Sequence, residues 1–127
     1  MKNREEDQRE RRLYTVSEIC ERMGITRKTL FYYDQIHLLE PSERVTSQQA
    51  KRYDDEKLQR LQSILQYREA GLCISEIRAL LDDQNVQRLS ILQNAMKRLR
   101  QEQNGVEQEI RKLAALIKAE EKRATMY

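Results

Sequence analysis

The residues of this chain best suited to chemistry lie close together, between positions 26 and 33. Thr26, Arg27, Lys28 and Thr29 place two hydroxyls and two cations on four consecutive residues. Hydroxyls and backbone amides at the start of a helix suit phosphate oxygens. Arg27 and Lys28 could read the O6 and N7 atoms of guanine, and a plain phosphate contact by either residue is equally open. The segment therefore favours contact with a nucleic acid.

Two short helices joined by a tight turn are predicted to position these residues. The first helix has an apolar stripe at helical spacing, formed by Val16, Ile19, Cys20 and Met23. Thr15 or Ser17 caps it, and an acidic residue three positions after Thr15 gives the spacing of a capping box. Gly24 ends this helix, and Thr26 caps a second one from about Arg27 to Gln35. The pattern is that of a helix-turn-helix.

The rest of the head is predicted to support this pair of helices. Pro41 closes the unit, and residues 42–53 are polar without a helical stripe, which is consistent with a loop or a small β-wing. An apolar stripe then predicts a helix from Asp54 to Gly71. Ser75 is expected to cap a further short helix.

Residues 86–121 carry the clearest pattern in the chain. Their seam follows strict 3-4 spacing through Leu89, Leu92, Met96, Leu99, Gln103, Val106, Ile110, Leu113 and Ile117. Spacing sustained over more than four heptads predicts a coiled coil, and a helix this long needs a partner, most simply a second copy of itself. Gln103 is a polar interruption at the midpoint. If the helices run antiparallel, the two Gln103 amides could bond each other near the dyad.

Composition limits the remaining possibilities. Of 127 residues, 39% are hydrophobic and 35% charged, with three Gly and one Pro, which predicts an all-α protein. We expect a disordered charged arm at 1–12, a head at 13–84, the coiled-coil helix at 86–121 and a tail at 122–127. Because no run suits a membrane span or a signal peptide, a cytoplasmic, nucleoid-associated protein is expected.

Catalysis and metal binding are not expected. The single His, the absence of a glycine-rich phosphate loop and the absence of paired carboxylates in an apolar setting argue against an enzyme and a cofactor. Cys20 and Cys73 have no metal-ligand spacing. Charge is polarised instead: residues 22–52 carry a surplus of three basic side chains, whereas residues 54–85 are acidic.

The ordered motifs of the head resemble those of the MerR family of bacterial transcription regulators. The resemblance covers residues 13 to about 84, and the family's long antiparallel dimerisation helix matches residues 86–121 in type and position. The motifs that carry it are Tyr14–Ile19, Gly24–Thr26, Arg27–Asp34, Leu38–Leu39, Pro41, Arg52–Asp54, the helix containing Leu58, Gly71 and the helix Ser75–Leu81.

This resemblance implies a winged helix-turn-helix whose second helix enters the major groove, while the wing after Pro41 contacts phosphates. It implies a homodimer on a palindromic promoter site, which distorts the DNA for RNA polymerase. Tyr32 and Tyr33 would reach the DNA backbone or pack behind it. The candidate DNA-binding residues are Thr15, Ser17, Thr26, Arg27, Lys28, Thr29, Tyr32, Tyr33, Arg44, Lys51 and Arg52. No separate C-terminal effector domain is expected, and the effector, if any, is unknown.

Three departures from the family pattern leave alternatives open. Phe31 stands where the family often has Arg, Gln49–Lys51 replaces a Gly-Tyr-Arg run in the wing, and His37 replaces a Gly. Phe31 and the altered wing favour a protein-interaction adaptor that keeps the fold without binding DNA. Four basic residues argue against that reading: Arg27, Lys28, Lys51 and Arg52. A recombination accessory factor is a second alternative, still on DNA.

Overall fold

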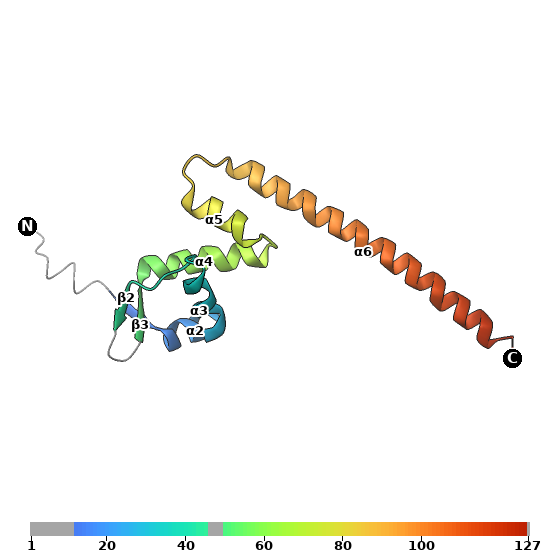
Figure 1. Cartoon of the computed structure of the whole chain (residues 1–127), viewed down its shortest axis with the longest axis horizontal. Helices are drawn as coiled ribbons and strands as arrows, with labels where there is room; N and C mark the ends of the chain where they lie inside the picture. The colour runs from blue at the N-terminus through green and yellow to red at the C-terminus, as the bar shows by residue number, and fades with distance from the viewer. Residues whose placement is uncertain (1–11, 46–49, 127) are drawn as a thin grey trace, which may run out of the picture. The chain divides into compact units, whose positions relative to one another are not determined.

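The computed structural model describes residues 12–45 and 50–126, in two compact units divided between residues 83 and 84 (Figure 1). The expected arm at 1–12 lies outside the described residues except for Arg12. So do the wing tip, residues 46–49, and Tyr127. The expectation of a mostly helical head with a small wing, followed by one long helix, is confirmed.

Seven elements make up the described part of the first unit, which we call the head. In chain order they are β1 (Leu13–Thr15), α2 (Val16–Met23), α3 (Arg27–Gln35), β2 (Glu43–Val45), β3 (Ala50–Asp54), α4 (Asp55–Glu69) and α5 (Ile74–Asp82). The helix-turn-helix is α2 and α3. The hairpin β2–β3 forms the wing, and α4 follows β3 directly.

The ends of α2 and α3 follow from local sequence. The Thr15 hydroxyl accepts a hydrogen bond from the Glu18 backbone N–H at 3.1 Å, and the Glu18 carboxylate accepts one from the Thr15 N–H at 3.2 Å. This is the predicted capping box. Gly24 ends α2 with φ of 65°, a conformation that costs little without a Cβ. Thr26 caps α3, as predicted.

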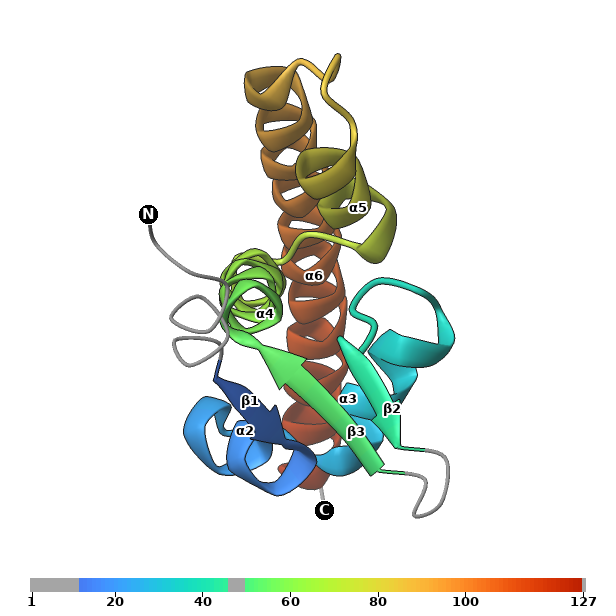
Figure 2. The same cartoon turned by 90° about the vertical axis from the view of Figure 1, so that its left-hand side faces the viewer.

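A three-stranded antiparallel sheet, in the order β1–β3–β2, joins segments far apart in the sequence (Figure 2). Tyr14 on β1 pairs with Tyr53 on β3, and Arg44 on β2 pairs with Lys51 on β3. The wing was predicted, but β1 was not. Three residues are too few to show an alternating pattern, and β1 is a strand only because β3 supplies its hydrogen-bonding partner.

The helix start at α5 differs from the prediction. Its N-cap is Cys73, not Ser75. The Glu76 carboxylate accepts a hydrogen bond from the Cys73 backbone N–H at 2.8 Å, which satisfies an N–H group that would otherwise lack a partner. Ser75 lies in the first turn, and its hydroxyl is 3.2 Å from the Cys73 sulfur. The acidic residue at the third helical position was the stronger signal for where this helix starts.

His37 adopts the backbone conformation of a glycine after α3, at the position where the family usually has Gly. Its φ is 60°, and no other non-glycine residue in the described part of the chain has a positive φ. The His37 N–H donates to the Asp34 carbonyl at 3.0 Å, and Nδ1 lies 3.1 Å from a carboxylate oxygen of Glu40. The backbone therefore turns as a glycine would turn it, with the side chain held at the surface.

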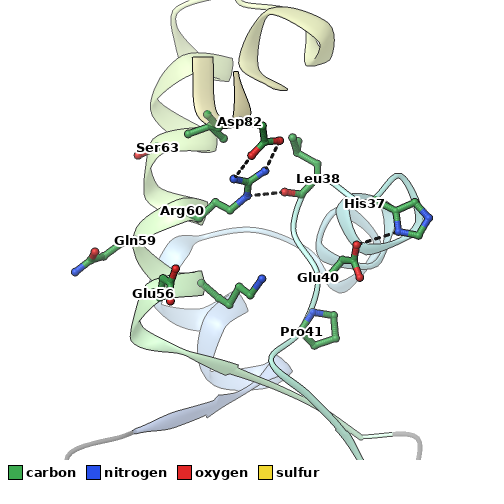
Figure 3. Close-up of a pocket in the computed structure, with 11 residues that line it drawn as sticks. His37, Leu38, Glu40, Pro41, Glu56, Gln59, Arg60, Ser63 and Asp82 are labelled. Atoms are coloured by element: carbon green, nitrogen blue, oxygen red, sulfur yellow. Dashed lines mark hydrogen bonds and ion pairs between the residues drawn. The ribbon is translucent and has the colours of Figure 1, made fainter. Parts of the chain in front are cut away.

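Arg60 on α4 connects three parts of the head (Figure 3). Its Nε donates to the Leu38 carbonyl at 2.8 Å, and its two terminal nitrogens bond the Asp82 carboxylate at 2.7 and 3.0 Å. The contacts border an open polar hollow of about 680 Å³. Arg60 thus ties α4 to the segment after α3 and to the end of α5.

Replacing Arg60 by Met should lower the free energy of unfolding by about 1–3 kcal/mol. The Leu38 carbonyl and the Asp82 carboxylate would lose charge-assisted hydrogen bonds. Gln59→Met, at an exposed neighbour on the same hollow, is the control and should change stability by less than about 0.5 kcal/mol. Urea unfolding measures both variants. Equal stabilities of the two would contradict the role given to Arg60.

The second unit contains one helix, α6, over Arg88–Ala124. Its 37 residues correspond to about 55 Å. Compared with the predicted span of 86–121, α6 starts two residues later and takes in three residues of the expected tail, where Lys122 and Arg123 suit a helix C-terminus. None of the helices in the described ranges combines the length and apolarity that crossing a membrane requires.

The predicted seam of α6 is largely exposed in the single chain. Leu99 is half-buried, and Gln103 is exposed. The remaining predicted seam residues are more than 40% exposed: Leu89, Leu92, Met96, Val106, Ile110, Leu113 and Ile117. Leu116, which was not predicted, is also exposed. The single chain therefore leaves a long apolar stripe exposed on α6, interrupted at Gln103.

Candidate nucleic-acid interface

A hollow of about 250 Å³ lies where the start of α2, the first half of α3 and strand β3 meet. It is lined by Thr15, Val16, Ser17, Arg27, Phe31, Ala50, Lys51 and Arg52. Five of these residues are among the predicted DNA-binding residues, although they come from three separate segments of the sequence. The fold therefore brings the recognition helix, the first helix and the wing to one basic surface.

Arg27 connects the two helices of the helix-turn-helix at this surface. Its guanidinium donates a short hydrogen bond to the Ser17 hydroxyl on α2. Both side chains are exposed, so a phosphate oxygen could bond the remaining guanidinium N–H groups. Lys28 is also exposed and makes no hydrogen bond or ion pair with any residue that the structure describes. Of the two predicted base readers, Lys28 is the less constrained.

The threonines of the interface serve first as helix caps. The Thr26 hydroxyl accepts from the Thr29 N–H at 3.1 Å and lies 3.0 Å from the Thr29 hydroxyl. The Thr15 hydroxyl caps α2 in the same way. Both helices thus present capped N-termini at the basic surface, and the positive end of each helix dipole attracts anions there.

The predicted tyrosine pair divides into two roles. Tyr32 is 48% exposed and remains a candidate for DNA contact. Tyr33 is only 5% exposed and packs in the core beneath α3, which is the second of the two roles that the family resemblance implied for this pair. The ring centroids lie 6.1 Å apart. Successive residues on a helix point about 100° apart, so one can face out while the next faces the core.

The wing cations Arg44 and Lys51, predicted to grip phosphates, are instead bound to a carboxylate. Arg44 donates to both oxygens of Asp34, at 2.6 and 2.9 Å, and the Lys51 ammonium lies 2.7 Å from Asp34 Oδ2. The hydrogen bonds from Arg44 lower the pKa of Asp34 most, and those from Lys51 add to this. Of the wing residues proposed to contact phosphate, Arg52 on β3 is the one that Asp34 does not bind.

Asp34 was not among the predicted site residues, although the sequence held a signal for it. Asp34 lies in the last turn of α3, where the helix dipole disfavours a carboxylate. It is also buried to 6% exposure, and no other polar or charged side chain in the described residues is buried. A carboxylate placed against local preference indicates a tertiary partner, and that partner is the wing.

Phe31 takes part in the same arrangement. The Lys51 ammonium lies 4.3 Å from the centroid of the Phe31 ring, a cation–π distance. Phe31, which stands where the family often has Arg, therefore packs against a cation of the wing.

Tyr53 on β3 is a buried neighbour of this arrangement. Its hydroxyl has no hydrogen-bond partner among the described residues, and burial raises the pKa of Tyr53 to about 12.

Comparison with known proteins identifies this architecture. Residues 14–84 match the family model described as the MerR HTH family regulatory protein. The chain belongs to the MerR family. Among the described residues, no group of three His, Cys, Asp or Glu side chains is arranged to hold a metal ion.

The similar proteins are transcription regulators. The chain is 49% identical over 70 residues to the transcriptional activator TipA of Streptomyces coelicolor, and 40% identical over 81 residues to the activator mta of Bacillus subtilis. These matches cover 55% and 64% of this chain. The chain spans only 27% and 31% of the length of those two relatives. A ZntR homolog of Haemophilus influenzae is 33% identical over 103 residues, which are 80% of this chain and 69% of that protein.

Solved structures support the same assignment. The N-terminal part of the Bacillus subtilis multidrug transporter activator, MtaN, superposes with a TM-score of 0.71 at 32% identity, covering 82% of this chain and 97% of that one. HiNmlR, a MerR family regulator lacking the sensor domain and bound to promoter DNA, gives a TM-score of 0.54 at 25% identity. That match covers 78% of this chain and 79% of HiNmlR.

Acid should destabilise this MerR head through Asp34. The pKa of Asp34 is lowered in the folded state from its ordinary value of 3.8. Asp34 therefore adds stability that is fully present above pH 3.8 and is lost as the pH falls through the pKa of the folded state. Asp34→Asn should therefore be less stable than the wild type at pH 7, and the difference should shrink on acidification. Thermal unfolding between pH 7 and 2.5 measures this. A constant difference at every pH would contradict it.

Proposed function

We propose that this protein is a homodimeric transcription regulator that binds a two-fold-symmetric promoter site and controls transcription by distorting the DNA. The observation that carries the proposal is the convergence of Ser17, Arg27 and Arg52 with two helix N-termini on one basic hollow. Cations, hydroxyls and helix N-termini are the groups that contact phosphates at protein–DNA interfaces. The promoter complex of HiNmlR supports promoter DNA as the ligand.

Each head contributes contacts of two kinds. Lys28 and Tyr32, exposed on α3, are positioned to meet base edges or the backbone in the major groove. Ser17, Arg27 and Arg52 are positioned to contact phosphates on either side, which orients the helix without reading sequence. The wing carries its own cations next to the groove, although Asp34 compensates part of their charge.

The dimer is proposed from α6. A helix of about 55 Å with an exposed apolar stripe is stabilised when a second copy covers that stripe. Two-fold symmetry of the protein then requires two-fold symmetry of the operator. A rigid connection between two heads can impose a bend or twist on the DNA between half-sites, at a cost of a few kcal/mol. RNA polymerase is the proposed partner that responds to this change.

Replacing Lys28 by Ala should weaken operator binding by about 1–3 kcal/mol if Lys28 reads a base. The affinity of Lys28→Ala for random-sequence DNA should then fall much less. Arg27→Ala should weaken binding to both DNAs equally, because Arg27 is proposed to contact a phosphate. Fluorescence anisotropy at fixed salt measures the four affinities, with Lys57→Ala on α4 as the control. Equal losses for Lys28→Ala on both DNAs would reassign Lys28 to the backbone.

Charging the apolar stripe should separate the subunits. Leu113→Glu would bury two carboxylates in the proposed seam, which is strongly unfavourable without partners. We expect a monomer in sedimentation analysis and loss of operator binding. Ala115→Glu, on the opposite face of α6, is the matched control and should remain dimeric. A Leu113→Glu variant that stays dimeric, or a monomer that binds with full affinity, would remove the proposed basis for two-fold recognition.

Capture of genomic fragments by the purified protein tests the function as a whole. The proposal predicts palindromes located in promoters and binding that weakens steeply with salt. An adaptor that has lost DNA binding would give no salt-sensitive complex. A recombination accessory factor would select recombination sites instead of promoters.

A further inference from the structure

We propose that Asp34 controls how much of the wing's positive charge is available to DNA, and thereby sets specificity. The inference rests on the proposed function only in taking DNA as the ligand. Its basis is the cluster formed by Asp34 on α3, Arg44 on β2 and Lys51 on β3, which we call the wing cluster. One carboxylate there bonds two cations that come from the two strands of the hairpin.

The two cations would repel each other without the carboxylate. Arg44 and Lys51 are direct cross-strand partners in the β2–β3 register. Like charges at directly opposed positions destabilise an antiparallel pair. The bidentate bonds from Arg44 and the ion pair with Lys51 offset that repulsion, at distances of 2.6 to 2.9 Å. The hairpin is therefore fastened to the recognition helix through Asp34.

Burial makes this fastening rigid and hard to replace with water. Asp34 is 6% exposed, and the Lys51 side chain is 23% exposed. Lys51 is also held over the ring of Phe31 on α3, at 4.3 Å. An anchored ion pair with several fixed partners keeps its geometry better than an isolated surface pair. The Arg44 side chain is 52% exposed, so its outer face remains open to solvent.

The charge balance of the wing cluster leads to a consequence for binding. Two cations and one carboxylate carry a net charge of +1, and removal of the carboxylate would raise this to +2. Non-specific affinity depends on how many phosphates a protein neutralises, whereas specific affinity also needs correct placement of the recognition helix. Asp34 therefore limits binding to arbitrary sequences while holding the wing at a fixed angle to α3.

Asp34→Asn separates these effects because it removes the charge and keeps the shape. We expect tighter binding to a random-sequence duplex at low salt and a steeper salt dependence, by about one additional phosphate contact. That contact adds about a 3.5-fold loss of affinity between 50 and 200 mM salt. Discrimination in favour of the operator should fall. Glu56→Gln, an exposed acidic residue on α4, makes the same change in net charge and should leave the slope unchanged.

The double variant Asp34→Asn/Arg44→Gln returns the net charge of the wing cluster to +1 and should restore the wild-type slope. If Asp34→Asn does not fold, the double variant is compared with Arg44→Gln alone. The same carboxylate is then removed with only one cation present, and the slope should again steepen by one phosphate contact. An unchanged or shallower salt dependence in either comparison would overturn the proposal. Equal losses of affinity for operator and random DNA in Asp34→Asn would also overturn it.

Hydrogen exchange gives a readout that needs no DNA. The amides of β2 and β3 should lose protection in Asp34→Asn, while those of α4 keep it, because Asp34 fastens the hairpin. Unchanged protection of the hairpin would overturn the fastening. A wild-type protein that shows no preference for any operator would defeat the proposed function, yet the exchange data and the random-DNA slope would still decide the role of Asp34.

Discussion

The geometry of the head depends on the pairing of β3 with two other strands. β3 lies between β1, which leads directly into α2, and β2, which carries Arg44. Its last residue caps α4 through the hydrogen bond from the Lys57 N–H to the Asp54 carboxylate, at 3.0 Å. One five-residue strand thus sets the relative positions of the first helix, the wing and the supporting helix. A shift in the register of β3 would change the relative positions of the side chains that line the basic hollow.

Charge at the interface is arranged more selectively than the composition indicates. The surplus of basic side chains in residues 22–52 is not simply displayed to solvent. Arg44 and Lys51 bond Asp34, Arg60 bonds Asp82, and Arg27 bonds Ser17. A protein that must find one site among many gains from fixed cations, because their positions discriminate between DNA geometries. Freely mobile lysines would favour any duplex equally.

The long helix raises a different physical problem, since nothing within its own unit can cover its apolar stripe. α6 is straight, and its seam side chains are exposed along most of its length. The polar Gln103 interrupts the stripe near the middle, where it can specify register at some cost in stability. In the proposed homodimer, association and DNA recognition are coupled, because the contact that buries the stripe determines how far apart the two heads can lie.

Sequence by itself determined the features that depend on near neighbours. Helical spacing placed α2 and α6, and the cap at Thr26 placed α3. The capping box fixed the start of α2, and Gly24 fixed its end, because each rests on contacts within a few positions. The recognition helix and most residues of the basic hollow followed from residue type. Only the tertiary structure decided that β1 is a strand, that Tyr33 is buried while Tyr32 is not, and that Asp34 bonds both wing cations. Each of these depends on residues brought together by the fold, and periodicity along one segment carries no information about the segment it will meet.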